Sequence, residues 1–391
     1  MKNIVGTPAR GENFFRREAE VETILTSLDN DNNIQIAAPR RIGKTSILFH
    51  MLDRRIGGYR YVYVDTESID SEEAFYKKLL KEILKLEGME SAVTRLLKAG
   101  GMIARKIKSI KVATAGIDFE EGKQDISYYD DLVHFLSGLV DEEESQLILL
   151  IDEFPQTILN IVSTHGMDAA IHFLQSNRTM RLNPDIVGKV RFIYTGSIGL
   201  NHTVAAIDST AFINDLNTLE IGPLSKADGR ALLTELLSFR NASIKPEARD
   251  YLLGKLEWLI PFHIQLLVQE LLRQELPDNQ ADISHVDRAF EEIIAARNEN
   301  HFAHYFSRLQ VQFNADDRRY AMSILQLIAQ NGTVRAAQLL AQAVVLNTRE
   351  QYRNIVEILI YDGYINNTGD ADLYRFNSPV VRTWWLKYKC Q

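Results

Sequence analysis

The residues best suited to chemistry lie in the stretch 34–52, IQIAAPRRIGKTSILFHML, where Gly43, Lys44 and Thr45 follow a buried apolar run and open a helix. In the loop pattern G-x-x-x-x-G-K-[ST], backbone N–H groups surround phosphates, the lysine reaches the outer ones and the hydroxyl holds Mg²⁺. Ala38 replaces the first glycine, which costs little unless that position needs a positive φ. The strand–turn–helix context disfavours an ordinary Gly-Lys-Thr turn and predicts a nucleotide site. The residues expected to contact the nucleotide here are Pro39, Arg40, Arg41, Ile42, Gly43, Lys44, Thr45 and Ser46.

A second element supplies acids. The stretch 147–157, LILLIDEFPQT, is an apolar strand that ends in Asp152 and Glu153. Downstream of such a loop, the aspartate steadies Mg²⁺ together with Thr45, and the glutamate polarises the attacking water as general base. An Asp-Glu pair that only caps a helix is the alternative, which the preceding six-residue apolar strand disfavours. Both acids together predict hydrolysis as well as binding.

Two further segments carry candidate catalytic groups. The strand ending FIYTGSIG offers Thr195 and Ser197 to sense a γ-phosphate, and a hydroxyl-rich turn before a helix cap explains them equally well. The stretch 173–182, FLQSNRTMRL, offers Arg178 and Arg181 as an arginine finger that would reach a neighbouring subunit. Surface arginines are common, so an ordinary exposed pair is the alternative.

Length, charge and cysteine content narrow the class of protein. A chain of 391 residues predicts two or three domains. The net charge of -8 argues against general coating of nucleic acid but allows a local basic patch. The single cysteine, Cys390, excludes an internal disulfide and a cysteine metal site, and fits a reducing compartment. With no apolar run of signal-peptide or membrane-span length, we expect a cytoplasmic protein with no membrane partner.

The order of apolar runs predicts three domains. Strand-like runs at 34–38, 61–65, 147–152, 190–195 and 219–221 alternate with helical patterns such as 74–86 and 129–140, which favours an α/β domain with a parallel sheet over residues 1–222. Residues 223–300 read as four helices, with Ser225 and Ser284 as N-caps and Pro261 at a first helical position. Residues 301–391 read as three helices and a β-hairpin, the order of a winged helix.

A basic segment interrupts the first domain at about residues 90–125. We interpret it as an insertion that faces a partner or a nucleic acid, although a solvated basic face explains it equally well. If DNA binds, we expect it at Arg95, Lys98, Arg105, Lys106, Lys108 and Lys111 or at the winged helix. The candidate recognition helix of the winged helix mixes Arg349 and Arg353 with Glu350 and Glu357, which favours a regulatory or protein-contacting role for that domain.

The combined motifs resemble the archaeal-type ATPase family, in the STAND branch of the AAA+ P-loop ATPases. GENFFRREAEVETIL resembles the opening F-x-x-R-E-x-E, APRRIGKTSIL the nucleotide loop, LIDEFPQ the Walker B motif and YTGS the sensor strand. PLSKADGRALL and IPFHIQLLVQELL resemble the start of the helical lid and its G-x-P motif, and FNSPVVRTWWLKY resembles the end of the winged helix. The resemblance covers essentially the whole chain.

The resemblance implies ATP or ADP with Mg²⁺, a three-layer α/β ATPase domain, an all-α lid and a winged helix. It implies that Phe15, Arg17 and Glu18 lie against adenine and ribose, that Pro261 touches the base, and that the winged helix packs or swings with nucleotide state. Two departures are Ala38 in the loop and Leu259 at the glycine of G-x-P. Many relatives carry a nuclease-like domain, and this chain has no such site, so we expect any effector to be another protein.

Two functions follow as hypotheses. The first is a slow or partner-stimulated ATPase switch whose nucleotide state controls oligomerisation or engagement of a protein partner. The second is a DNA-associated AAA+ ATPase that regulates or loads a nuclease, transposase or replication factor. A small-molecule kinase is disfavoured, since it needs neither a lid of this kind nor a winged helix.

Overall fold

The computed structural model describes residues 1–87, 127–139 and 146–390, which form two compact units. One unit comprises Arg17–Ala37 and Lys44–Glu220 and is called the sheet unit below. The other comprises Met1–Arg16, Ala38–Gly43 and Ile221–Gln391 and is called the helical unit. The predicted basic insertion at 90–125, with all six of its candidate DNA-binding residues, lies outside the described residues.

The sheet unit is built on five parallel strands in the order β2-β3-β4-β1-β5. The strands are β1 (Asn33–Ala37), β2 (Arg60–Asp65), β3 (Leu147–Asp152), β4 (Val190–Thr195) and β5 (Leu216–Glu220). This confirms the parallel sheet predicted from the apolar runs. β5 begins at Leu216, earlier than predicted. It is an edge strand with exposed Asn217 and Thr218, so its first residues do not form a continuous apolar run.

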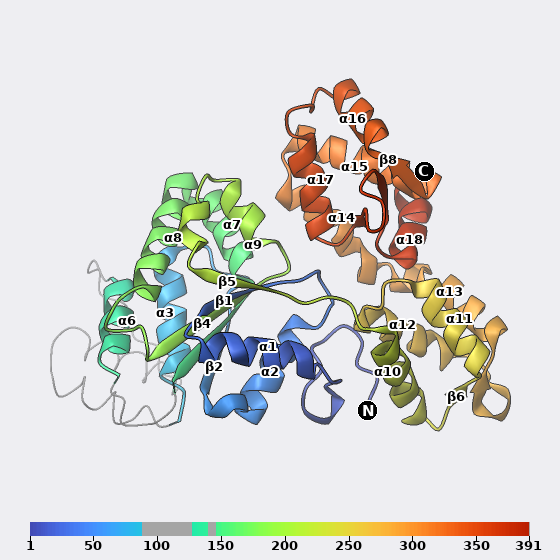
Figure 1. Cartoon of the computed structure of the whole chain (residues 1–391), viewed down its shortest axis with the longest axis horizontal. Coiled ribbons are helices and arrows are strands. Elements are labelled where there is room, and N and C mark those ends of the chain that lie inside the picture. Colours follow the sequence, from blue (N-terminus) through green and yellow to red (C-terminus); the bar gives the residue numbers. More distant parts are fainter. Residues whose placement is uncertain (88–126, 140–145, 391) are drawn as a thin grey trace. The chain divides into compact units, whose positions relative to one another are not determined.

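Helices cover both faces of this sheet (Figure 1). The core on one face joins the sheet to α3 (Glu72–Ile83), α6 (Tyr128–Ser137), α7 (Phe154–His165), α8 (Met167–Arg181) and α9 (Leu200–Ala205). α1 (Glu18–Asp29) and α2 (Lys44–Arg54) lie on the other face. Ser71 and Ser127 cap α3 and α6 by accepting a backbone N–H, which marks where these helices begin.

The helical unit begins its long C-terminal part with four helices, as the sequence predicted. They are α10 (Lys226–Ser238), α11 (Pro246–Leu256), α12 (Pro261–Leu271) and α13 (Ile283–Ile293), with β6 (Ser243–Ile244) pairing β7 (Gln280–Ala281). Ser225 caps α10 and Pro261 opens α12. The predicted cap Ser284 is wrong: Asp282 caps α13, because its carboxylate accepts the N–H groups of Ser284 and His285.

The remainder of the helical unit contains α14 (Asn300–Gln312), α15 (Ala315–Asn331), α16 (Ala336–Val345), α17 (Tyr352–Tyr361) and α18 (Pro379–Lys389). The predicted hairpin is β9 (Ile365–Asn366) and β10 (Leu373–Phe376). It gains a third strand, β8 (Thr333–Arg335), which was missed because three residues are too few to show a period. Short 3₁₀ helices lie at Gly11–Asn13, Ile56–Gly58, Thr210–Ile213, Pro277–Asn279 and Ala296–Asn298.

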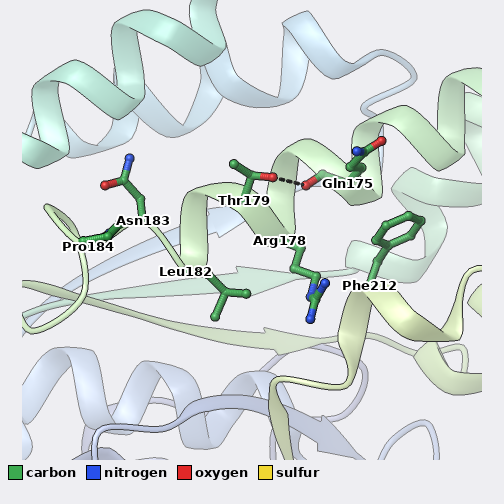
Figure 2. A pocket seen from close by; sticks show the side chains of 7 residues that line it. All are labelled: Gln175, Arg178, Thr179, Leu182, Asn183, Pro184 and Phe212. Atoms are coloured by element: carbon green, nitrogen blue, oxygen red, sulfur yellow. Dashed lines mark hydrogen bonds between the residues drawn. The ribbon is translucent and has the colours of Figure 1, made fainter.

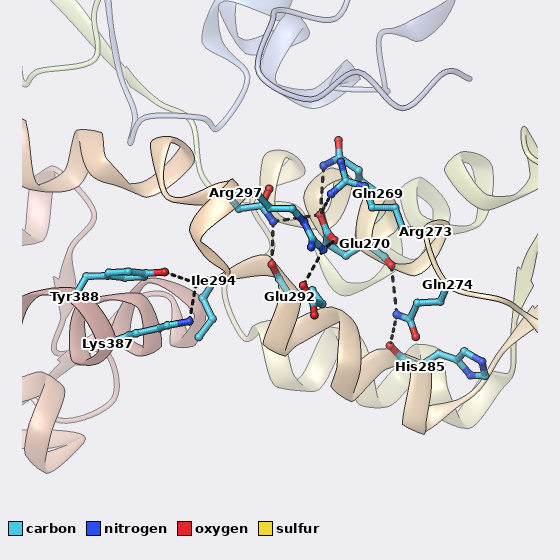
Figure 3. Close-up of polar contacts among 11 residues, drawn as sticks. Gln269, Glu270, Arg273, Gln274, His285, Glu292, Ile294, Arg297, Lys387 and Tyr388 are labelled. Carbon is cyan, nitrogen blue, oxygen red and sulfur yellow. Dashed lines mark hydrogen bonds and ion pairs between the residues drawn. The ribbon is translucent and has the colours of Figure 1, made fainter.

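A buried carboxylate ties α12 to the segment that leads into α14 (Figure 3). Glu270 accepts hydrogen bonds from Arg273 at 2.6 Å, from Asn298 at 3.1 Å and from Arg297. Near the end of α18, the side chains of Lys387 and Tyr388 donate to the carbonyl oxygen of Ile294, which follows α13. A buried charge with such partners resists separation, because breaking the pair would leave the charge uncompensated. No helix among the described residues is both long enough and apolar enough to cross a membrane.

Candidate nucleotide-binding site

The loop between β1 and α2 has the backbone of a phosphate-binding turn. Arg41 and Gly43 have positive φ angles of 68° and 106°, and α2 begins at Lys44. Ala38 is not among the residues with positive φ. Alanine is therefore unstrained where the glycine of the pattern would stand. α2 begins directly after this loop, so the positive end of its helix dipole faces the loop, which suits a bound anion.

Thr45 and Asp152 meet at the carboxyl ends of β1 and β3. The Thr45 hydroxyl donates to Oδ2 of Asp152 at 2.8 Å, and the Tyr63 hydroxyl donates to the same oxygen at 3.1 Å. Oδ1 of Asp152 accepts the backbone N–H of Glu153 at 3.1 Å. A hydroxyl and a carboxylate side by side are the oxygen ligands that Mg²⁺ takes beside nucleotide phosphates. These residues therefore fit the cation that the loop implies.

The electrostatics of Asp152 also suit a cation. Its side chain is buried, and this burial, with the neighbouring Glu153 charge, raises the pKa of the carboxyl. The hydrogen bond from Thr45 and the charge of Lys44 oppose the shift. A buried carboxylate with a raised pKa is stabilised in its charged form when a divalent cation binds beside it.

Glu153 is hydrogen-bonded to Ser197. It has a left-handed backbone, with φ 60°, directly after β3. Its Oε2 accepts two hydrogen bonds from Ser197, one from the backbone N–H at 2.9 Å and one from the hydroxyl at 2.8 Å. The geometry therefore joins the candidate general base to the candidate sensor.

The other candidate sensor, Thr195, ends β4, which lies between β1 and β3. Its hydroxyl is buried and makes no hydrogen bond within the described residues. The next residue, Gly196, lies so close to α7 that an added Cβ would stand 2.5 Å from Cδ of Pro155. This close approach positions the tip of β4, and only glycine allows it.

The two candidate fingers differ in burial, and Figure 2 shows Arg178 among the residues that line a pocket. Arg181 is buried, and its guanidinium donates to both oxygens of Asp215 at 2.8 Å and to Asn177 at 2.7 Å. Its position in the core does not fit the surface role considered for it. Arg178 is 36% exposed, donates to Asn214 at 3.1 Å and lines a pocket. The pocket of about 420 Å³ is lined by Gln175, Arg178, Thr179, Leu182, Asn183, Pro184 and Phe212.

For the residues expected to contact the base, the structure shows contacts with nearby parts of the same unit. Arg17 precedes α1, is buried and pairs with Glu20. Pro261 opens α12. Leu259 is buried in the lid core, where an added Cβ on Gly229 would stand 3.0 Å from its Cδ1. The leucine that replaces the glycine of G-x-P therefore packs against α10.

Sequence reasoning missed two groups, one in each unit. Tyr63 lies in the apolar run of β2, where its aromatic ring read only as a buried strand residue. Phe262 follows Pro261, and its ring lies 4.0 Å from the guanidinium carbon of Arg41. For Phe262 the sequence offered one indication: an aromatic residue at a helix start and two loop arginines are the residue types that form a cation–π contact.

Comparisons with known proteins were made for the whole chain. No protein-family model matches it, and no curated protein matches its sequence. Among solved structures, it is similar to a Walker-type ATPase of Pyrococcus abyssi, with 18% identity, a TM-score of 0.66 and coverage of 98% of this chain and 99% of that one. It is also similar to the ORC2 protein of Aeropyrum pernix in ADPNP–ADP complexes, with 14% identity, a TM-score of 0.54 and coverage of 96% and 97%. At these identities the likeness establishes the fold alone, a five-stranded parallel sheet with helices on both faces followed by a helical region.

Proposed function

We propose that this chain binds ATP with Mg²⁺, hydrolyses it slowly, and uses the nucleotide state to control self-association or engagement of a protein partner. The observation that carries the proposal is the convergence of Thr45 and Asp152 at 2.8 Å beside a loop of phosphate-binding geometry. Residues 107 positions apart meet in this way only because parallel strands end at one sheet edge.

Each residue has a part in this proposal. Lys44 and the N–H groups at the start of α2 hold the phosphates, while Thr45 and Asp152 hold the cation. The bound Mg²⁺ neutralises charge that develops on the phosphates. Glu153 polarises the attacking water, and the released proton passes to its carboxylate.

Slow turnover follows from the position of Glu153. Its Oε2 is engaged by the Ser197 N–H and hydroxyl, so only Oε1 is left to accept a proton until these bonds open. A partner or a neighbouring subunit that draws Ser197 away would speed hydrolysis. The contact between Ser197 and Glu153 is therefore where we expect a partner to stimulate ATP hydrolysis.

The loop also provides a route from nucleotide to helical unit. Residues Ala38–Gly43 belong to that unit by their contacts, although both neighbouring chain segments belong to the sheet unit. Arg41 lies over Phe262, and an added Cβ on Gly363 would stand 3.0 Å from Cβ of Pro39. A ligand that changes the loop conformation changes these contacts, which is the differential interaction that a switch requires.

ATP turnover tests the proposal. Wild-type protein and Glu153→Gln are compared with and without duplex DNA, and mass is measured by light scattering with ADP and with a slowly hydrolysed ATP analogue. We expect turnover that needs Glu153, ignores DNA and accompanies a nucleotide-dependent change of mass or of partner capture. Turnover that rises several-fold with DNA would replace the protein switch with a DNA-associated ATPase. If the wild type binds no nucleotide, both the protein switch and the DNA-associated ATPase are excluded.

A further inference from the structure

Basic side chains gather around the loop arginines within the helical unit. Arg40 and Arg41 come from the loop, His263 from α12, and His304 and Arg308 from α14. These residues are far apart in sequence, and α14 is not part of any nucleotide-binding motif identified above. The cluster contains more positive charge than an interior normally holds without an anion.

Arg41 is a partly buried member of the cluster. Its guanidinium stacks on the ring of Phe262 at 4.0 Å, while its Nε is buried and makes no hydrogen bond within the described residues. Burial and the neighbouring Arg40 charge lower the pKa of Arg41. A buried guanidinium N–H without an acceptor is costly, so this donor suits a ligand that brings an oxygen.

His304 presents a second set of unused groups. Both ring nitrogens are shielded from solvent and lack a hydrogen-bond partner among the residues described, and the ring packs at 4.3 Å from that of Tyr305. Burial, followed by the charges of Arg40, Arg41 and Arg308, holds the pKa of His304 far below its usual range. The imidazole is therefore neutral at neutral pH in the absence of an anion.

The charges facing His304 do not balance. Arg308 pairs with Asp362 at 3.3 Å, and both side chains are buried. His263 is buried, and burial followed by the Arg41 charge lowers its pKa to about 3. Arg40 and Arg41 thus leave two positive charges on the loop side, next to a neutral imidazole. A phosphate group bound there would offset these charges and so remove the repulsion that they exert on a protonated His304.

We propose that Arg41 and His304 form an anion site that binds a phosphate group, and that His304 takes up one proton from solvent when the group binds. The inference rests on the proposed nucleotide binding, because the loop that carries Arg41 would bring that phosphate. His304 then donates N–H groups to phosphate oxygens, and Arg41 Nε finds its missing acceptor. A neutral imidazole has one N–H to donate, whereas the protonated ring has two, so the anion favours protonation.

Calorimetry on the full chain tests this proton uptake. ATP, ADP and inorganic phosphate are titrated separately at pH 7 with Mg²⁺, in buffers of different ionisation enthalpy but similar ionic strength. The number of protons taken up is the slope of binding enthalpy against ionisation enthalpy of the buffer. We expect about one proton per nucleotide in the wild type, since the group titrates only when the anion is bound. The variant His304→Gln should bind nucleotide roughly tenfold more weakly than the wild type and take up no proton.

Controls separate this inference from the proposed function. His172→Gln changes an exposed histidine of the sheet unit and should leave the uptake unchanged. Uptake with ATP but not ADP assigns the site to the terminal phosphate, and uptake with inorganic phosphate alone assigns it to a free anion. Nucleotide binding with no uptake, or with uptake that survives in His304→Gln, would overturn this site while leaving the ATPase proposal intact. Absence of nucleotide binding in the wild type would instead remove the proposed function.

Discussion

The hydroxyl of Thr45 and the carboxylate of Asp152 lie 2.8 Å apart, although the two residues are 107 positions apart in the chain. One opens a helix after β1 and the other ends β3, so the contact depends on two strands that are not neighbours in the sheet. Tyr63 of β2 completes the arrangement through a bond of 3.1 Å to the same carboxylate oxygen. Thr45, Asp152 and Tyr63 thus link α2 to β3 and β2 through hydrogen bonds.

We expect Thr45→Val to abolish the Mg²⁺-dependent part of nucleotide affinity, because valine keeps the shape but removes the oxygen. A loss of at least tenfold, or about 1.4 kcal/mol, is expected. Binding of a fluorescent ATP analogue with Mg²⁺ or with chelator measures it. The control Thr45→Ser keeps the hydroxyl and should keep the Mg²⁺ dependence. Equal Mg²⁺ dependence in Thr45→Val and wild type would show that the cation does not use this residue.

Ser197→Ala should raise the basal turnover several-fold. The substitution removes one of two hydrogen bonds to Glu153 and leaves the backbone N–H in place. A single hydrogen bond contributes about 1 kcal/mol, which corresponds to a several-fold effect on the availability of the base. Steady-state phosphate release measures it, with Glu153→Gln as the variant that should lose roughly 10²–10⁴-fold. A fall in turnover for Ser197→Ala would favour the γ-phosphate sensing role instead.

Gly196→Ala should destabilise the protein by about 1–3 kcal/mol, the usual cost of overpacking. The new Cβ would stand 2.5 Å from Pro155, in the turn that holds Glu153 and Ser197. The control is Gly254→Ala in α11, where nothing lies within 4 Å of an added Cβ. That change should be neutral or stabilise by up to about 1 kcal/mol, because alanine favours the helix. Chemical denaturation of both variants gives the comparison.

Substitutions of the two arginines of α8 should have different effects, one on stability and the other on turnover between subunits. Arg181→Ala removes a buried guanidinium that donates to both oxygens of the half-buried Asp215, leaving the more distant Arg178 at 3.8 Å, and should cost about 3–5 kcal/mol. Arg178→Ala removes a partly exposed side chain and should change stability by less than about 1 kcal/mol. If Arg178 acts on a neighbouring subunit, its removal lowers turnover only at protein concentrations that support association. Turnover that falls equally at all concentrations would exclude a role in trans.

The free energy of unfolding should decrease as the pH falls from about 7 to 5. Burial lowers the folded-state pKa of His263 to about 3, and His304 is shifted in the same direction. Both groups remain neutral in the folded protein while they protonate in the unfolded chain below about pH 6.5, so acid favours unfolding by up to about 1.4 kcal/mol per pH unit for each. Denaturation of nucleotide-free protein across this range measures the slope. His304→Gln should reduce it, whereas His172→Gln should not.

Much of the sheet unit could be predicted from local sequence. Continuous apolar runs such as 147–152 mark strands that are buried on both faces, and Gly43, Lys44 and Thr45 mark the loop, because each signal lies within a few consecutive residues. The edge strand β5 and the three-residue β8 could not be predicted in this way. Their residues are partly exposed or too few to carry a period.

The sequence by itself determined the order of elements and the residue types at the loop and after β3, since local propensity and burial specify both. Only the tertiary structure decided which of those residues meet. Ser197 reaches Glu153 because β4 lies beside β3, and Arg181 is buried because Asp215 lies where α8 ends. Arg41 lies over Phe262, and its charge acts on His304, although both partners are more than 200 residues away in the chain, which no local pattern encodes.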